Sequence, residues 1–281
     1  MTEQPRIING LREIAGDYDA LICDVWGVVH NGIRQYDAAV DALRRFRADR
    51  GRVVLFSNAP RLPAAIERQF AKIGVPIDCY DVIVSSGGIA REALAQRAAQ
   101  GKFAIVHLGP ERDVNVFAGL DVELSAPDKA SLILATGFID DNVETAEDYR
   151  NTLVELRRHG LLMICANPDE FVPRGNKLVP CAGGLARIYA SLGGEVVYYG
   201  KPYLPIYKEA LQAAGAPKRA LIVGDGLETD ILGANTAGIE TLYIADGVHS
   251  EELGAFTPEN LVALFAKKGV RVDIATHALT W

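Results

Sequence analysis

The sequence predicts an α/β protein: an open, doubly wound parallel-sheet core with a second α/β domain inserted into it. Short apolar runs rich in β-branched residues are typical of strands buried on both faces. Amphipathic segments separate several of these runs, and strand–helix alternation favours parallel pairing with right-handed crossovers. The runs are ALIC (20–23), VVLF (53–56), VVYYG (196–200), ALIVG (220–224) and TLYIA (241–245).

The helices of this core are predicted from amphipathic stretches between the strands. The pattern indicates helices within residues 36–51, 62–74 and 204–215. The second and third stretches close with Gly74 and Gly215, and glycine is the residue that most often ends a helix. The last segment, residues 260–281, reads as a helix, a turn and a short extended tail.

The middle of the chain carries a second set of elements. Residues 103–109 and 131–137 read as strands, residues 144–160 as a helix, and residues 161–167 as another strand. This set is large enough for a separate α/β domain. We therefore expect a core made of residues 1–85 and 181–281, with residues 86–180 as the inserted domain.

Composition limits the classes of partner. Hydrophobic residues make up 49% of the 281 residues, and the formal charge of −7 repels nucleic acid. The N-terminus has no apolar signal core, and no apolar run approaches the ~20 residues of a membrane span. The cysteines form no C-x-x-C pair, which favours a reducing compartment, so we expect a cytoplasmic protein. They are Cys23, Cys79, Cys165 and Cys181.

Polar residues follow the predicted core strands and define a candidate site. Ligands of open α/β sheets bind beyond the carboxyl ends of the strands, so these residues are expected to converge. Carboxylates, an ammonium group and a hydroxyl–amide pair suit phosphate and Mg²⁺, which prefers oxygen ligands. A carboxylate also attacks phosphorus in some enzymes, and Asp24 is the best candidate because its strand is the first. The set is Asp24, Ser57, Asn58, Lys201 and Asp225.

Four ordered segments resemble the motifs of the haloacid dehalogenase (HAD) superfamily: DVWGVVHNG, SNAP, GKP and GDGLETD. The large insert resembles the branch with a type-two α/β cap, which includes nitrophenyl-phosphate, nucleotide and sugar-phosphate phosphatases. The resemblance implies a Mg²⁺-dependent phosphatase for a small phosphorylated metabolite. It implies Asp24 as nucleophile and metal ligand, Ser57 and Asn58 as phosphate ligands and Lys201 as phosphate ligand and charge stabiliser. It further implies Asp225 as metal ligand and Asp230 as a support of the metal.

Trp26 departs from this family's usual first motif, D-x-D. The second Asp of that motif protonates the leaving oxygen, activates water and gives its backbone carbonyl to the metal. Trp26 keeps only the carbonyl role, because indole exchanges no proton near neutral pH. General acid–base help is typically worth ~10²–10⁴-fold, so its loss predicts a slow phosphatase rather than a dead site.

Three interpretations of Trp26 remain open from the sequence. In the first, the substrate has a leaving group of low pKa, as in an acyl phosphate or anhydride, and needs little acid catalysis. In the second, His30 acts as the general acid and base; the alternative for His30 is a packing role. In the third, the protein is a catalytically impaired regulatory subunit that binds a phosphorylated metabolite. The enzyme ranks above the binder, since a pure binder needs no nucleophile.

The inserted domain is expected to select the substrate. The segment ANPDEFVPRG resembles the cap loop that faces the leaving group, which makes Asn167, Asp169 and Arg174 candidate specificity residues. Each is also a common turn or surface residue. A second loop, HLGPERD, offers His107, Glu111 and Arg112, with solvation as the simpler interpretation. Relatives of this type often pair through the cap, which gives a homodimer as a further expectation.

Overall fold

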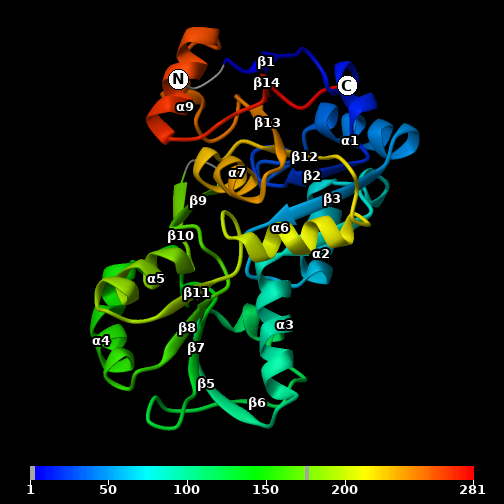
Figure 1. The fold of residues 1–281 in the computed structure, drawn as a ribbon. Coiled ribbons are helices and arrows are strands. Elements are labelled where there is room, and N and C mark those ends of the chain that lie inside the picture. The colour runs from blue at the N-terminus through cyan, green and yellow to red at the C-terminus, as the bar shows by residue number, and fades with distance from the viewer. Residues whose placement is uncertain (1–3, 175–176) are drawn as a thin grey trace. The chain divides into compact units, whose positions relative to one another are not determined.

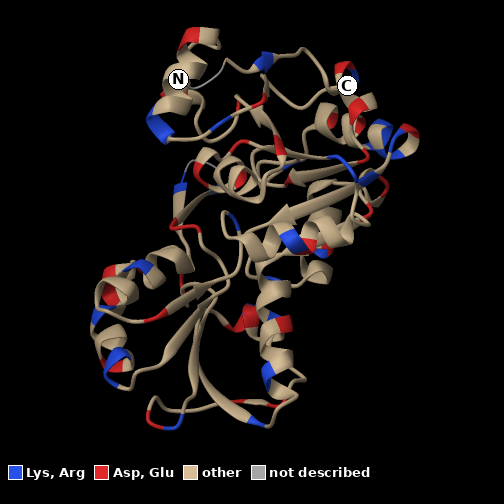
Figure 2. Ribbon diagram, viewed as in Figure 1, with Lys and Arg blue, Asp and Glu red and all other residues tan. Residues whose placement is uncertain are grey.

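The computed structural model describes residues 4–174 and 177–281 and divides the chain into two compact units (Figure 1). The core unit comprises the described residues up to Ser57, with Glu67–Val84 and Lys201–Trp281. The inserted unit comprises Asn58–Ile66 and Ser85–Gly200. Acidic and basic residues are interspersed along the helices of both units (Figure 2). No helix among the described residues is long and apolar enough to cross a membrane.

The core unit is built on a seven-stranded sheet in the order β1-β14-β13-β12-β2-β3-β4. The pairings from β1 through β3 are all parallel. Its strands are β1 (Arg6–Ile7), β2 (Ala20–Asp24), β3 (Arg52–Ser57), β4 (Val82–Ser85), β12 (Ala220–Gly224), β13 (Glu240–Ile244) and β14 (Ile274–Thr276). Residues of β2 are buried throughout, as expected for a central strand covered on both faces.

Helices of the core unit pack onto this sheet through apolar side chains. Tyr207 of α6 meets the ring of Phe56 in β3, and Phe265 of α9 meets that of Tyr243 in β13, both edge to face. The α-helices are α1 (Asp37–Asp49), α2 (Pro63–Ile73), α6 (Leu204–Ala213), α7 (Leu232–Ala237), α8 (Ser250–Leu253) and α9 (Pro258–Lys268). Shorter turns are η1 (Leu11–Glu13), η2 (Ala15–Asp17), η3 (Ile77–Cys79) and the π-helix η6 (Leu227–Ile231).

The inserted unit has its own five-stranded parallel sheet, in the order β11-β8-β7-β5-β6. These strands are β5 (Phe103–Leu108), β6 (Val122–Leu124), β7 (Leu132–Ala135), β8 (Leu162–Cys165) and β11 (Val196–Tyr198). A separate hairpin pairs β9 (Phe171–Arg174) with β10 (Lys177–Pro180). The helical segments are α3 (Ser86–Ala98), η4 (Glu111–Val116), η5 (Ala146–Tyr149), α4 (Arg150–Arg158) and α5 (Ala182–Ser191).

Both faces of this second sheet are covered. Ile133 and Ala135 of β7 pack with Leu153 of α4 and Leu185 of α5. The alternate residues of the same strand, Leu132 and Leu134, pack in a cluster with α3 and η4. Side chains alternate along a strand, so one apolar run supplies two cores. The predicted α/β class, with a parallel-sheet core and an inserted α/β domain, is confirmed.

The predicted end of the insert at residue 180 differs from the structure. Residues 196–200 were expected to form a core strand, but β11 pairs with β8, matching Val196 to Met163. Helix α5 also packs in the apolar cluster of the second sheet. The inserted unit therefore runs to Gly200, immediately before Lys201.

Candidate active site

The core sheet reverses its winding direction between β2 and β12. From β2 the chain continues to β3 and β4 on one side, and from β12 it continues to β13 and β14 on the other. Asp24 is the last residue of β2, and Asp225 follows β12 directly. Open α/β sheets bind ligands at such a switch point, beyond the carboxyl ends of the strands.

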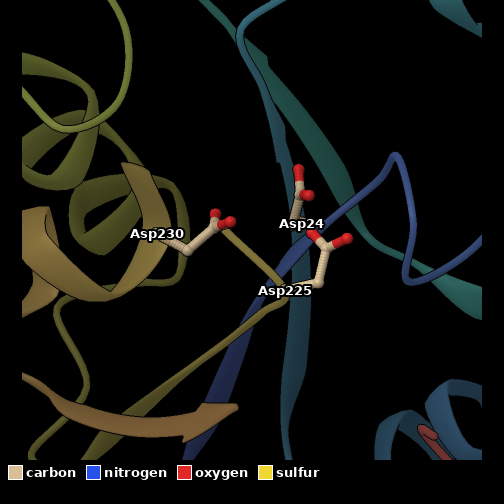
Figure 3. A group of neighbouring side chains, drawn as sticks. All are labelled: Asp24, Asp225 and Asp230. Carbon is tan, nitrogen blue, oxygen red and sulfur yellow. The ribbon is translucent and has the colours of Figure 1, made fainter. Parts of the chain in front are cut away.

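Three carboxylates meet at this position (Figure 3). Asp24, Asp225 and Asp230 each offer an oxygen within 4.8 Å of the others, and all three side chains are buried. Asp230 comes from η6, the π-helical turn that follows β12. π-Helical turns are rare and are frequent at functional sites. The strand-end prediction for Asp24 and Asp225 is therefore matched by their placement, and Asp230 joins them directly.

Lys201 lies in the same cluster. Its Nζ donates to Asp24 Oδ1 at 2.5 Å and to Asp230 Oδ1 at 2.8 Å, with only 4% of the residue exposed. The ammonium also sits 4.7 Å from the centre of the Phe56 ring. Burial alone would lower the pKa of Lys201, but the charges of Asp230 and Asp24 hold the pKa well above its usual value. Lys201 therefore remains charged.

Backbone groups hold the carboxylates in place. Gly226 N–H donates to Asp230 Oδ2 at 3.1 Å, and Val248 N–H donates to Asp225 Oδ2 at 2.8 Å. Gly27, at a φ of +82°, approaches Asp225 so closely that a Cβ there would lie 2.1 Å from Oδ2. A side chain at residue 27 is thus excluded both by backbone conformation and by contact with the site.

The cluster carries more negative charge than its own residues neutralise. Burial, followed by the charge of Asp230, raises the pKa of Asp24 well above its usual value. The same two causes raise the pKa of Asp225 to about 6. One ammonium faces three buried carboxylates, so a bound cation would relieve the remaining repulsion. An all-oxygen set of this kind suits Mg²⁺.

Trp26 does not place a titratable group in this cluster. Its ring lies against Gly32, where a Cβ would be 2.4 Å from Trp26 Cη2, and it meets the His30 ring edge to face at 4.9 Å. The His30 ring in turn contacts Phe70 of α2 at 5.7 Å. Trp26, His30 and Phe70 therefore form a row of edge-to-face aromatic contacts that ties the loop after β2 to α2.

His30 occupies the packing role that the sequence left as its alternative. The residue is 1% exposed, and its Nδ1 accepts a hydrogen bond from Gly32 N–H at 3.0 Å. Burial lowers the pKa of His30 to about 4, so the imidazole is neutral at neutral pH. A buried, neutral ring used in packing is a poor source of a proton for a leaving group.

Of the remaining predicted site residues, Ser57 belongs to the core unit and the others belong to the inserted unit. Ser57 is buried at the end of β3, as the strand-end argument predicts. Asn58 belongs to the inserted unit, where its Nδ2 donates to Asp169 Oδ1 at 2.8 Å. Asn167 Oδ1 accepts from Asp169 N–H, which makes it a turn residue. Arg174 forms a double hydrogen bond with Asp141.

Sequence analysis missed several residues that the structure brings to these sheet edges. The hydroxyl of Tyr207 donates hydrogen bonds to the carbonyls of Thr229 and Asp230 and so holds the π-helical turn in place. Asp113 and Asp141 are buried beyond the ends of β5 and β7. The strand-end argument would have found both Asp residues had it been applied to the inserted domain as well as to the core.

Comparison with known proteins agrees with this geometry. The model of the haloacid dehalogenase-like hydrolases matches residues 21–123, and a related HAD-hydrolase-like model matches residues 198–266. A haloacid dehalogenase-like hydrolase from Brucella suis 1330 is 40% identical and superposes with a TM-score of 0.85, covering 97% of this chain and 99% of that one. The chain belongs to the haloacid dehalogenase-like hydrolases.

Two comparisons with Mycobacterium tuberculosis proteins refine this family assignment. D-glycerol 3-phosphate phosphatase is 29% identical over 85% of this chain, which spans 66% of that enzyme's length. A crystal structure of glycerol phosphate phosphatase from the same organism, in complex with magnesium, is 26% identical, with a TM-score of 0.71 over 94% of this chain and 77% of that one. The predicted membership of the HAD superfamily is confirmed, and the relatives that match include phosphatases.

Proposed function

We propose that this HAD-family hydrolase is a Mg²⁺-dependent phosphatase that cleaves a small phosphorylated metabolite through an aspartyl-phosphate. The observation that carries the proposal is the buried cluster of Asp24, Asp225 and Asp230 around the Lys201 ammonium. Carboxylates that converge at a sheet's switch point, with a single cation among them, suit metal binding and phosphoryl transfer. The phosphatase relatives support the same reaction class.

Mg²⁺ fits the charge and the donor atoms of this cluster. Asp24, Asp225 and the backbone carbonyl of Trp26 would hold the ion, and Asp230 would support it from the π-helical turn. The bound ion would supply positive charge to the phosphoryl oxygens and to the site as a whole. Oxygen donors and excess negative charge are both present without it.

The protein's own residues then perform distinct steps. Asp24 attacks phosphorus, the bond to the leaving oxygen breaks, and water later cleaves the aspartyl-phosphate to regenerate the carboxylate. Asp24 Oδ1 accepts a hydrogen bond from Lys201, and Oδ2 is the proposed attacking atom. The Lys201 ammonium neutralises charge on the phosphoryl group being transferred, and Asp230 holds that ammonium in position. Ser57 and Asn58 are the proposed phosphate ligands, although Asn58 also donates a hydrogen bond to Asp169.

Trp26 and His30 determine which substrates react quickly. Neither supplies an acid: Trp26 has no group that ionises near neutral pH, and His30 is buried and neutral. The leaving oxygen must therefore depart with little help from the protein. This favours substrates with leaving groups of low pKa, such as acyl phosphates, over simple alkyl esters.

The inserted unit is proposed as the substrate-selecting cap, with Asn167, Asp169 and Arg174 on its candidate loop. Asn167 and Asp169 act by fixing the turn of this loop, whereas Arg174 has an exposed guanidinium group that is proposed to contact the substrate directly. Pairing of two copies through this unit and a cytoplasmic location remain predictions.

A second function is favoured by one observation: Trp26 stands where the family's first motif has its second Asp, and it makes an edge-to-face aromatic contact instead. In that case the protein binds a phosphorylated metabolite without turning it over.

Phosphate release over a broad set of phosphorylated metabolites, with Mg²⁺ or with EDTA, separates the two functions. The phosphatase predicts release that requires Mg²⁺ and is lost in Asp24→Asn. Binding of the same compounds with no release from any of them would favour the metabolite-binding function instead.

A further inference from the structure

A hollow of about 400 Å³ opens on the core unit beside the first residues of β3. It is bounded by the second half of α1, by the start of β3 and by the segment from η3 to the residue before β4 (Figure 1). All of these residues belong to the core unit. Its volume is within the range of small-molecule sites, roughly 300–1,000 Å³. The charged residues of its lining are Arg44, Arg47, Arg52, Asp78 and Asp81.

The hollow lies at the opposite end of the core strands from the carboxylate cluster. β2 and β3 pair in parallel, with Arg52 matched to Ala20, the first residue of β2, whereas Asp24 is the last residue of β2. At about 3.3 Å a residue, about 13 Å of strand separates Arg52 from the level of Asp24. A ligand in this hollow therefore occupies a site separate from the catalytic one.

Arg44 and Arg47 are held in place by carboxylates that bind only part of each guanidinium group. Arg44 Nε donates to Asp78 Oδ1 at 2.6 Å, and Arg47 Nε donates to Asp81 Oδ1 at 2.7 Å. Arg47 Nη1 also donates to the Asp78 carbonyl at 3.1 Å. Asp81 is itself fixed, because its Oδ2 accepts from Val53 N–H at 2.8 Å. Within the described residues, both Nη groups of Arg44 and the Nη2 group of Arg47 remain as donors for an anion.

Arg52 supplies a positive charge that no carboxylate in the described part of the chain balances. Its Nη1 donates only to the carbonyl of Ala213, at the end of α6, at 3.0 Å. The lining thus has one guanidinium group more than it has carboxylates, on a chain whose formal charge is −7. Guanidinium groups stay charged in proteins and bind phosphate or carboxylate oxygens through paired N–H donors.

We propose that this hollow binds a multiply charged oxyanion of metabolite size, whose phosphate or carboxylate oxygens pair with Arg44, Arg47 and Arg52. Arg52 supplies the charge in excess, and the other two arginines supply N–H donors that Asp78 and Asp81 already hold in place. The described lining contains no aromatic ring on which a base could stack, so the ligand is recognised through its charged groups.

The two ion pairs would also serve a purely structural role, which is to fasten α1 to the segment before β4. Exposed pairs of this kind stabilise a fold only weakly. Fastening uses Arg44 and Arg47, but it requires neither the hollow nor a third guanidinium group beside it that binds only a carbonyl. The two interpretations therefore differ most at Arg52, which a structural role leaves without influence on anion binding.

The test is calorimetric titration of the whole chain with pyrophosphate and, separately, with propane-1,2,3-tricarboxylate, in metal-free buffer of low ionic strength. Without a divalent cation the carboxylate cluster of the core carries excess negative charge and repels anions, so the heat reports other sites. The variants are Arg52→Gln and Arg44→Gln. Arg45→Gln is the matched control, because Arg45 is next to Arg44 on α1, pairs with Asp41 and lies outside the hollow.

The wild type is expected to bind at least one of the two probes. Arg52→Gln and Arg44→Gln should each weaken that binding by about 10-fold or more, the range for hydrogen bonds to charged groups. Arg45→Gln should change the Kd less than about twofold. Binding of pyrophosphate alone assigns a phosphate compound as the ligand, binding of the tricarboxylate alone assigns a polycarboxylate, and binding of both supports a site for either oxyanion.

Arg52→Lys keeps the charge without the planar fork and should lose only part of the affinity. Urea unfolding of each variant verifies that the fold is retained, as expected for exposed side chains. No binding of either probe to the wild type, or binding that Arg52→Gln and Arg44→Gln leave unchanged, would overturn the proposal. An equal loss in Arg45→Gln would also overturn it, because the effect would then come from overall charge rather than from the hollow.

Discussion

The two sheets of this protein both gather charged side chains beyond their strand ends, but they balance acidic and basic groups differently. At the core switch point, three buried carboxylates surround one ammonium. At the switch point of the inserted unit, between β5 and β7, three arginines accompany two buried carboxylates. The core edge therefore lacks positive charge, whereas each buried carboxylate of the inserted edge faces at least one guanidinium group. The parallel-sheet topology determines where a ligand binds, and the residues after each strand determine which ligand is bound.

The largest expected effect is at the core edge, with Asp24→Asn. The amide cannot attack phosphorus, so phosphate release should fall by at least about a thousandfold. The measurement is Mg²⁺-dependent phosphate release, with Asp49→Asn, an exposed substitution at the end of α1, as the control. Full activity in Asp24→Asn would remove Asp24 as the nucleophile and with it the chemical contrast between the two edges.

Lys201→Met tests how far the core edge depends on its one ammonium. The change leaves Asp24 and Asp230 buried without their partner, and breaking a buried pair in this way costs about 3–5 kcal/mol. Urea unfolding should show this loss, and adding Asp230→Asn should recover part of it because the two sites are coupled. A Lys201→Met protein as stable as the wild type would mean that the carboxylates do not need the ammonium.

Trp26→Asp tests the missing acid. A carboxylate at this position should raise the rate on an alkyl phosphate relative to p-nitrophenyl phosphate by about 10- to 100-fold, because only the poorer leaving group needs a proton. Trp26→Phe, which keeps an aromatic ring against His30, should leave the ratio unchanged. The measurement is kcat/KM on both substrates. A parallel change on both would show that Trp26 acts through packing alone.

Asp113→Asn is expected to have the smallest effect and a distinct pH dependence. Because burial raises the folded-state pKa of Asp113 to about 6, its charged form destabilises the fold above that pH, and the cost disappears as pH falls toward the unfolded pKa. The variant should therefore be more stable than the wild type by about 1–3 kcal/mol at pH 7.5 and nearly equal to it at pH 4. Denaturant unfolding at the two pH values measures the difference. A gain of the same size at both would exclude titration of Asp113 as the cause.

Much of the fold was predictable because its signals are local. Apolar runs such as residues 20–23 and 220–224 predicted buried parallel strands, and β2 and β12 are adjacent in the structure. The strand-end argument predicted Asp24 and Asp225 together, since parallel strands that are neighbours must end at the same edge. The short edge strands β1 and β6 were not predicted, because two or three residues carry no periodic signal.

The assignment of a strand to a sheet was not readable from the sequence. Residues 196–200 look like any other buried strand, and only the pairing of Val196 with Met163 places β11 in the inserted unit. Pairing depends on which apolar faces meet, and residues remote in sequence supply those faces.

The sequence by itself determined the α/β class, the family and the acidic strand ends, because each depends on residue type and local order. Tertiary structure alone decided that His30 packs between Trp26 and Phe70 as a neutral ring. It also decided that Asp113 and Asp141 are buried among arginines rather than solvated. Burial and charge environment depend on neighbours brought from other parts of the chain, and they set whether a histidine or carboxylate titrates, packs or binds.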